Sequence, residues 1–503
     1  MMKIKMITAV FLLLTLNSCK DFLDVEPETV VTPSNFFQSQ KDFEQAVGGV
    51  YAPLQDLYEQ DWILTEMRSD NTHFIYDVGN RGSKPEEDPA TFLVENNNRN
   101  VENKWTYNYQ IISRANQVLH LIDNVNFDQA AKDNLKGQTL FLRAFAYYDL
   151  VKNFGGVPLF LEPATSYEGT FKKQSPINNI YEQIIADANM AAGLLPARAN
   201  QTPGRATLGA AYTLLADVYI TLDRWTDAET ALRPVTNMGY SLLPNYADVF
   251  NPTNEGNSEI IFEVEYLEGT PLSLGSIFPY RFLPVLVDPS VITGVGPASI
   301  NNDGAFNTPT PDLLKAYEDT LKDERFAASI GFYTGSSPLV GVTYNHTPYI
   351  KKYQHPHARY NETDQNWPVY RYAEVLLLLA ESLNEQGKSS EALLYLNQVR
   401  NRAGLNEVTI ADQVGLREAI LQERRIELAF ENKRWHDLVR GGLAVNVMNS
   451  FGARVKANPQ DYYYAPGNAA FPASFNVTEN SLVYPIPINE IIVNPDLEQN
   501  PGY

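Results

Sequence analysis

Apolar positions in the C-terminal third of the chain recur at helical spacing. Residues 371–403 predict two helices joined by a turn at Gly387, because small and large apolar side chains return every three or four positions on each side of it. The same offsets of 0, 3, 12 and 16 occur earlier: Ala380, Leu383, Ala392 and Leu396 correspond to Ala216, Tyr219, Ala228 and Leu232, and Val399 to Val235. The sequence therefore predicts two helical hairpins of one kind, at 205–238 and 371–403.

This alternation of small and large side chains is typical of tetratricopeptide hairpins, in which two helices pack closely. Apolar stripes of the same period predict further helices at 41–57, 105–122, 134–151 and 176–195. The sequence FGGVP at 154–158 ends the third of these, because a proline cannot continue a helix. One alternating stretch, at 260–265, predicts a short strand. The expected fold class is mainly α, a tetratricopeptide-like helical-repeat scaffold with little β structure.

Three stretches lack a clear helical period: residues 70–100, 270–367 and 441–503 are rich in Pro, Gly, Asn and aromatic residues. Long irregular insertions in a regular scaffold are common places for binding sites. We therefore expect loops in all three and ligand-binding residues in the first two. No low-complexity linker separates the hairpins, so we expect a single body over 41–503. It has a helical part at about 41–265, a loop-rich part at about 270–367, and C-terminal repeats with a tail at 368–503.

The N-terminal residues predict export and lipid attachment. Lys3 and Lys5 precede an apolar run, ITAVFLLLTL, which is too short to span a bilayer but suits the core of a signal peptide. The run leads into LNSC, which looks like a bacterial lipobox, and Cys19 is the one cysteine in the sequence. We predict a signal peptide at 1–18, lipidation of Cys19 and a tether over 19–40 that joins the body near Phe36 and Phe37. The alternative is a secretory signal with an incidental cysteine.

The net charge of −21 narrows the range of partners. An acidic surface does not attract nucleic acid or anionic lipid, so we expect no nucleic-acid partner and a membrane attachment that depends on acyl chains.

The GKS sequence at 387–389 has Ser382 where a phosphate-binding loop needs glycine. His346, His355 and His357 have no accompanying carboxylate or cysteine spacing. We therefore expect neither a metal nor a cofactor.

Glu423, Glu427 and Glu431 lie four residues apart, with arginines between them. Paired carboxylates can perform acid–base catalysis. The simpler interpretation is that ion pairs hold this helix in register against its neighbours. Because the sequence also lacks the GxSxG and HExxH motifs of hydrolases, we expect a protein that is not an enzyme.

Several segments together resemble the SusD/RagB family of Bacteroidetes outer-membrane lipoproteins. They are CKDFLDVEP at 19–27, SDN at 69–71, FLRAFAYYDLVKNFGGVPL at 141–159, RATLGAAYTLLADVYI at 205–220, RYAEVLLLLAE at 371–381, ERRIELAFENKRWHDLVR at 423–440 and YPIPINEIIVNPDLEQNPGY at 484–503. The resemblance implies a SusD-like fold and a lipoprotein on the cell exterior that captures a nutrient, most often a glycan. It also implies delivery to a SusC-like TonB-dependent β-barrel transporter, over which the lipoprotein lies as a lid.

Glycan binding needs flat apolar faces for the sugar ring and planar polar groups for its hydroxyls. Residues 70–77 supply Asn71, His73 and Tyr76, and the loop-rich part supplies Tyr280, Arg281, Tyr344 and Trp367. These seven are the predicted ligand-binding residues. Trp62 also lies near a loop and is a weaker candidate, whereas Trp105, Trp225 and Trp435 lie on helical faces and are expected in the core.

Three other functions remain open from the sequence. The first is the same uptake role with a peptide or another non-sugar nutrient as the ligand. A surface hydrolase would need catalytic motifs that are missing here. A structural adaptor is the third, because tetratricopeptide grooves often bind protein segments and a fold does not fix a function.

Overall fold

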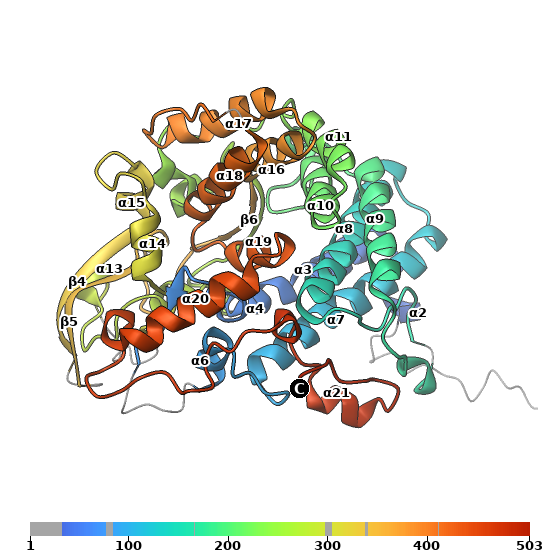
Figure 1. Cartoon of the computed structure of the whole chain (residues 1–503). Helices are drawn as coiled ribbons and strands as arrows, with labels where there is room; N and C mark the ends of the chain where they lie inside the picture. Colours follow the sequence, from blue (N-terminus) through green and yellow to red (C-terminus); the bar gives the residue numbers. More distant parts are fainter. Residues whose placement is uncertain (1–32, 77–83, 165, 297–303, 338–340, 411) are drawn as a thin grey trace, which may run out of the picture.

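The computed structural model describes residues 33–76, 84–164, 166–296, 304–337, 341–410 and 412–503. It is mainly helical, as predicted (Figure 1). The helices of the first half are α2 (Pro33–Phe36), α3 (Gln40–Tyr51), α4 (Pro53–Tyr58), α5 (Asp61–Leu64), α6 (Lys84–Thr91), α7 (Arg99–Leu121), α8 (Gln129–Phe154), α9 (Ile177–Leu194), α10 (Leu208–Thr221) and α11 (Trp225–Val235). The helix predicted at 41–57 is interrupted, because Pro53 has no N–H to donate and begins a new helix instead.

The second half contains four short helices and then six that include the predicted repeat. They are α12 (Phe278–Arg281), α13 (Ser290–Thr293), α14 (Pro311–Ala316), α15 (Glu324–Ser329), α16 (Tyr372–Glu385), α17 (Ser389–Arg402), α18 (Gln413–Glu427), α19 (Arg434–Arg440), α20 (Ala444–Ala457) and α21 (Ile488–Val493). No helix of the described ranges is long and apolar enough to cross a membrane.

Both predicted hairpins are present, as α10–α11 and α16–α17. Ala216 and Ala228 of the first, and Ala380 and Ala392 of the second, have no exposed surface. Helix α11 also packs against α16, so the two hairpins form one layer although residues 236–371 separate them in sequence (Figure 1). The turn at Gly387 has a φ of +75°, a backbone conformation that glycine adopts without strain. Helix α9 packs on α8 as its predicted partner.

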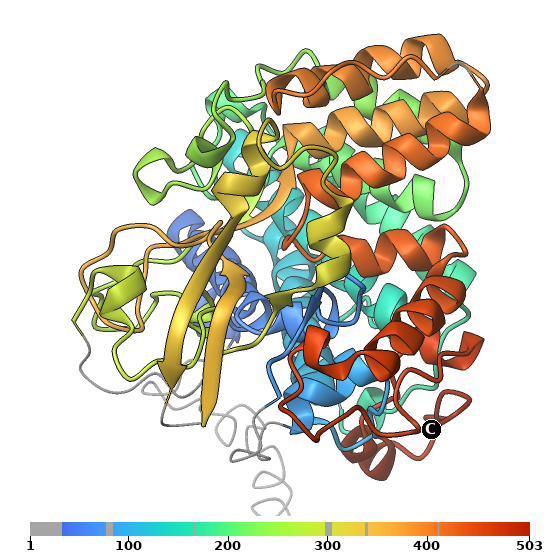
Figure 2. The same ribbon diagram turned by 60° about the vertical axis from the view of Figure 1, so that its left-hand side comes forward.

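The described strands form three two-stranded antiparallel sheets. The predicted strand is β2 (Ile260–Val264), and it pairs with β6 (Trp367–Arg371), which leads directly into α16. β1 (Thr72–His73) pairs with β3 (Thr308–Pro309). A longer pair, β4 (Ile330–Ser337) with β5 (Val342–Ile350), lies on the opposite side of the molecule from α9 (Figures 1 and 2). This hairpin was not predicted, because Gly331 and Gly335 interrupt the alternation of its first strand.

The expectation of loops at 70–100 and 441–503 was partly wrong. Helix α6 lies in the first stretch and the 14-residue helix α20 in the second. Ala444, Met448, Phe451 and Val455 are buried along one face of α20. They belong to a second hydrophobic cluster, with Trp435, Tyr462, Tyr464 and Phe475, beside the large cluster that the other helices share. The helical period was present, but the aromatic and Pro-rich residues that follow it obscured the pattern.

The last segment of the chain returns to the first helices. The Tyr484 hydroxyl donates to the Leu64 carbonyl at 2.6 Å, and the Asn500 amide donates to the Phe154 carbonyl at 2.9 Å. Near the other end, Phe37 packs against Phe43 with ring centroids 5.0 Å apart, where the sequence predicted that the tether joins the body. Residues 484–503 therefore fasten segments that are far away in sequence.

Candidate functional site

Two of the predicted ligand residues, Asn71 and His73, lie in the interior. Both have no exposed surface. The Asn71 amide donates to Glu66 at 3.0 Å and its carbonyl oxygen accepts from Arg425 at 2.8 Å. Burial lowers the pKa of His73 to about 3, so the imidazole is neutral at physiological pH. In this arrangement neither side chain can contact a ligand at the surface.

Tyr280, Tyr344 and Trp367 are also interior, each at most 1% exposed. The Tyr280 hydroxyl is 2.7 Å from His357 Nε2, and the Tyr344 hydroxyl accepts from the Val285 N–H at 3.0 Å. Trp367 stacks on Tyr353 with ring centroids 5.4 Å apart. Tyr280 and Tyr344 therefore have protein partners in the interior, whereas Trp367 also lines the third cavity described below; a ligand role for these three stays a prediction.

The tryptophans divide almost as predicted. Trp105 and Trp435 are buried, and Trp225 lies at the margin of the core and is partly buried. Trp62, the weaker ligand candidate, is 1% exposed and packs edge-on against Phe282. Its nearness to a loop did not indicate exposure.

Tyr76 and Arg281 are the two predicted ligand residues that are partly exposed. Tyr76 stacks on Tyr464 with ring centroids 5.1 Å apart. Both rings line a surface cavity of about 180 Å³, here called the Tyr76 cavity. Its other lining residues are Phe74, Lys84, Glu87, Asp88, Thr91, Leu93, Ala469, Ala470, Phe471 and Ser474. Of these, Phe471 is 57% exposed, so the cavity combines an accessible aromatic face with two carboxylates. Sequence reasoning missed Tyr464 and Phe471, although they lie in the aromatic-rich C-terminal segment.

A second opening lies between α7 and α21. It has a volume of about 430 Å³, and aromatic and aliphatic side chains form most of its wall, among them Trp105, Tyr109, Phe160, Phe171 and Leu497. The exposed residues Ile492 and Val493 lie next to each other on α21, and Val493 also lines this opening. Nothing in the sequence analysis pointed to this groove.

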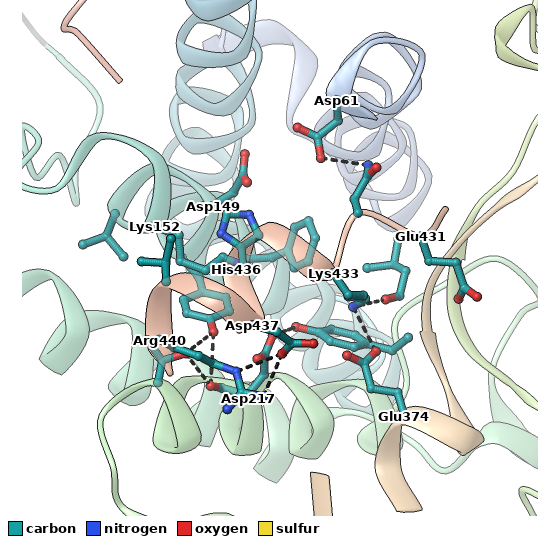
Figure 3. Close-up of a pocket in the computed structure, with 18 of the residues that line it drawn as sticks. Asp61, Asp149, Lys152, Asp217, Glu374, Glu431, Lys433, His436, Asp437 and Arg440 are labelled. Carbon is teal, nitrogen blue, oxygen red and sulfur yellow. Dashed lines mark hydrogen bonds and ion pairs between the residues drawn. The ribbon is translucent and has the colours of Figure 1, made fainter. Parts of the chain in front are cut away.

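A third cavity, of about 230 Å³, lies between α8, α10, β6 and the segment 424–440 (Figure 3) and is called the enclosed cavity here, although Ile177 at its edge is 46% exposed. Most of its charged side chains are paired. Lys104 binds Asp149 at 2.8 Å and also Asp61. Glu374 binds Lys433 at 2.9 Å and Arg424 at 3.2 Å. These pairs form a rigid polar wall.

Asp437 completes this wall by accepting from two arginines. Its carboxylate lies 3.0 Å from Arg424 Nε and 2.7 Å from Arg440 Nη2. Burial raises the pKa of Asp437, but the two guanidinium groups lower it more, and the resulting pKa is about 2. Asp437 is therefore ionised at every pH at which the protein is expected to work.

Lys152, Asp217 and His436 also line the enclosed cavity, and they have far fewer partners. Lys152 makes no hydrogen bond or ion pair with the residues that the structure describes, and its Nζ lies 4.1 Å from the centre of the Tyr148 ring. Asp217 accepts from the Tyr370 hydroxyl at 3.0 Å, and within the described ranges no cation pairs with it. Burial and the neighbouring lysines, Lys152 first, lower the pKa of His436 well below its usual value, so its ring is neutral.

Glu423 and Glu427 of α18, and Glu431 just beyond it, form ion pairs, as the sequence analysis expected, but their burial was not predicted. Glu427 has no exposed surface and lies 3.1 Å from Arg371 and 3.2 Å from Arg325, with Arg402 also bound. Burial raises its pKa, but Arg402, Arg371 and Arg325 lower it to about 2. The partners come from distant segments and are not the arginines that neighbour Glu427 in sequence.

The two flanking glutamates share these arginines. Glu431 binds Arg371 at 2.7 Å, and Glu423 binds Arg325 at 2.6 Å and Arg400 at 2.9 Å. All three carboxylates are therefore occupied by cations in the interior, which leaves none of them available to a substrate. Among the described residues, no three His, Cys, Asp or Glu side chains are grouped so that they could hold a metal ion.

Comparison with known proteins identifies the family. The model of the SusD family matches residues 258–503, and a model described as "Starch-binding associating with outer membrane" matches residues 21–220. SusD-like protein P2 of Formosa agariphila is 31% identical, and the match covers 100% of both chains. The chain belongs to the SusD family. The resemblance seen in the sequence is thereby confirmed.

Other SusD relatives agree over nearly the whole length. A SusD-like protein of Bacteroides ovatus is 25% identical over 99% of this chain and 98% of its own. A solved SusD homologue from Bacteroides thetaiotaomicron has a TM-score of 0.79 and covers 95% of this chain and 100% of its own, at 21% identity. A solved laminarin-binding SusD-like protein is 25% identical, with a TM-score of 0.72 over 93% of this chain and 100% of its own.

The motifs that identify the SusD family contact one another in the interior. Asp70 and Asn71 of the SDN segment bind arginines of the 423–440 segment, with Arg434 at 2.9 Å from Asp70. The 141–159 segment and the 423–440 segment face each other across the enclosed cavity. These motifs therefore specify how the segments pack, and they do not coincide with the Tyr76 cavity.

Proposed function

We propose that this protein is a glycan-binding SusD lipoprotein that delivers its ligand to a SusC-like TonB-dependent transporter of the outer membrane. The observation that carries the proposal is the full-length match to SusD-like proteins, together with the starch-binding family model over the N-terminal part. The laminarin-binding neighbour supports the same ligand class. We propose that the protein binds without turnover, since the sequence lacks hydrolase motifs and the α18 carboxylates are occupied by arginines.

The Tyr76 cavity is the proposed place of glycan contact. Aromatic rings offer flat apolar faces to the C–H side of a sugar ring, and carboxylates accept hydrogen bonds from its hydroxyls. Tyr76, Tyr464 and Phe471 supply rings at this cavity, and Glu87 and Asp88 supply carboxylates. Arg281 remains a proposed contact from the loop-rich part because it is partly exposed. The cavity is open to the surface at Phe471, as capture of a long chain requires.

Affinity electrophoresis against a panel of polysaccharides tests this proposal. We expect at least one polysaccharide to retard the protein without the release of new reducing ends. Tyr76→Ala should weaken that binding by about tenfold or more, since a stacked aromatic anchor contributes about 2 kcal/mol. Tyr167→Ala is the matched control, because Tyr167 is 69% exposed and lies outside this cavity.

Each contrary result has a distinct meaning. Steady release of reducing ends by a homogeneous sample would favour a surface hydrolase. Equal retardation of the parent and Tyr76→Ala would place the glycan site elsewhere. Binding of peptides in the same assay, without binding of any polysaccharide, would favour the uptake of a non-sugar nutrient.

The proposed anchor is Cys19, which lies outside the described residues. Acyl chains on one cysteine can hold a protein on a membrane, because each buried methylene contributes about 0.8 kcal/mol. Cys19→Ala should therefore leave the protein in the soluble fraction of cells that lack the transporter. Fractionation of this variant with outer membranes in such cells would contradict lipid anchoring. We also propose that the helical scaffold contacts the transporter. Co-purification of the parent and of Tyr76→Ala with the transporter tests this.

A further inference from the structure

The enclosed cavity contains two opposite charges that do not meet. The Lys152 ammonium and the Asp217 carboxylate both line it, yet they form no ion pair with each other. Separated charges in a low-dielectric interior are costly unless something polar lies between them. The other charged groups of the wall are already paired, so the gap between Lys152 and Asp217 is the electrostatically unsatisfied part of the cavity.

Polar atoms with no partner lie in the same wall. The Asn432 side chain is 7% exposed and donates to Asp61 at 3.1 Å, but its carbonyl oxygen has no hydrogen bond from the described residues. Arg424 Nη1 is likewise buried without an acceptor among them. Buried polar groups are normally hydrogen-bonded, so a donor and an acceptor left over at one cavity indicate a polar occupant.

The charge of the wall determines what kind of occupant fits. Six acids line the cavity, namely Asp61, Asp149, Asp217, Glu374, Glu431 and Asp437, against four basic side chains, Lys152, Arg424, Lys433 and Arg440. Lys104, Lys352 and Arg371 lie behind the wall and pair with Asp61, Asp149 and Glu431, so the charges around the cavity nearly balance and favour neither an anion nor a cation. A hydroxyl both donates and accepts, so neighbouring hydroxyls on one ring can bind Asp217 and Lys152 together.

The remaining surface of the cavity suits a sugar ring. The largely buried rings of Tyr58, Tyr148, Tyr181, Tyr370 and Trp367 line it beside the polar groups. The volume of about 230 Å³ is below the range of about 300–1,000 Å³ typical of sites for drug-sized molecules. A single sugar ring is therefore the proposed occupant. Ile177 lines the cavity and is 46% exposed, which places the entrance at the start of α9.

We infer that the enclosed cavity is a second ligand site, which binds one neutral sugar residue through Lys152, Asp217 and Asn432. In this site Asp217 accepts from one hydroxyl and Lys152 donates to a neighbouring one; Figure 3 shows both side chains among those that line the cavity. The neutral His436 ring supplies a further donor or acceptor without adding charge. This site lies apart from the Tyr76 cavity, with no lining residue in common, so it does not depend on the glycan site proposed above.

Saturation-transfer NMR of the full mature protein with neutral hexoses, and with glucuronate as an anionic comparison, tests this inference. We expect at least one neutral hexose to bind and glucuronate to bind about tenfold more weakly or not at all. Asp217→Asn and Lys152→Gln should each weaken hexose binding by about tenfold or more, because each removes a charge-assisted hydrogen bond. If no neutral hexose binds at millimolar concentrations, the cavity holds only water and the inference is wrong.

A pair of variants at exposed positions avoids the risk of misfolding. Ile177→Trp should close the entrance and abolish hexose binding. Met190→Trp, on the same helix at 50% exposure and outside the cavity, should leave it unchanged. Hexose binding that Tyr76→Ala abolishes and Ile177→Trp preserves would overturn the inference, since the sugar would then occupy the surface cavity. Retardation by polysaccharide should be the same in Ile177→Trp as in the parent, so failure of one site is distinguishable from failure of the other.

Discussion

The helical hairpins and residues 270–367 fill their interiors with different side chains. In α10–α11 and α16–α17 the facing positions are alanine, leucine and valine. In the loop-rich part aromatic side chains are buried beside the aliphatic ones, and some of the buried tyrosine hydroxyls bind backbone groups. The Tyr344 hydroxyl accepts from the Val285 N–H, and the Tyr353 hydroxyl donates to the Phe430 carbonyl at 2.8 Å. A helix pairs its own backbone groups, whereas an irregular segment must pair them with side chains.

This difference explains why the aromatic residues of the loop-rich part suggested a binding site. A tyrosine that closes a backbone hydrogen bond in the interior has the same sequence appearance as one that stacks on a ligand. Tyr344 is of the first kind, whereas the Tyr280 hydroxyl contacts the His357 side chain and Trp367 stacks on Tyr353. Aromatic content in an irregular insertion therefore indicates how that insertion builds its core, and exposure must be known before a ligand role is assigned.

The largest expected effect lies where the two regions meet, at Glu427. This carboxylate binds Arg325 of the loop-rich part as well as Arg371 and Arg402 of the repeat. Glu427→Ala leaves those cations buried without their partner and should cost about 3–5 kcal/mol of unfolding free energy. Chemical denaturation measures it. Glu391→Ala removes an exposed pair with Arg233 and should cost less than about 1 kcal/mol. Equal losses of unfolding free energy in the two variants would mean that the buried ion pairs of Glu427 do not join the loop-rich part to the repeat.

Tyr280→Ala tests whether the loop-rich part depends on its rings. The side chain is 1% exposed, so its removal leaves a cavity and should destabilise the protein by about 3 kcal/mol or more. Tyr280→Phe keeps the ring and loses the contact with His357, which should cost about 1 kcal/mol. Thermal melting of both variants gives the comparison. Unchanged melting of Tyr280→Ala, with weaker glycan binding, would return Tyr280 to the ligand site.

Acid should weaken the buried ion pairs of Glu427 and Asp437 before it affects the apolar helical hairpins. Glu427 and Asp437 have folded pKa values of about 2, below their unfolded values of 4.5 and 3.8. Between these values the unfolded chain binds protons that the folded protein does not, so stability falls as the pH falls from about 4.5 to 2. The loss should be about 2–3 kcal/mol for each group, because each tenfold change in proton affinity corresponds to about 1.4 kcal/mol. Urea unfolding across this range measures it, and a flat profile would contradict the assigned ionisation.

Ala380→Leu should have the smallest effect of the four. Ala380 has no exposed surface on α16, so a larger side chain overpacks the helical layer and should cost about 1–3 kcal/mol. Ser390→Leu is the control, because Ser390 is exposed on α17 of the same hairpin. A melting midpoint that is equal in both variants would remove Ala380 from the close contact.

Short sequence patterns predicted the helical scaffold well, because the contacts within a helix or a hairpin join residues that are close in sequence. The offsets that relate Ala380 to Ala216 predicted both hairpins, and the spacing of Glu423, Glu427 and Glu431 predicted ion pairs to neighbouring helices. The identities of their partners depend on chain segments far away. Arg325 is 102 residues from Glu427, so no sequence window contains that pair.

The cavities could not be predicted for a related reason. The Tyr76 cavity joins Phe74, Tyr76 and residues 84–93 to residues 464–474, and the enclosed cavity joins seven separate segments. Tyr76 was predicted from the residues beside it in sequence. Tyr464 is recognised only in the structure, where the centroids of the two rings lie 5.1 Å apart. Family motifs located the segments 141–159 and 423–440, and only the fold shows that they enclose a space.

The fastening of residues 484–503 onto the first helices affects the order in which the protein folds. Tyr484 and Asn500 bind the carbonyls of Leu64 and Phe154, which a ribosome makes hundreds of residues earlier. Until those late residues emerge, both carbonyls and the surfaces around them lack their native cover. The early helices are therefore only partly assembled, and prone to aggregation, while the rest of the chain is synthesised. Completion of the native state is a late event, slowed by the long loops that these contacts close.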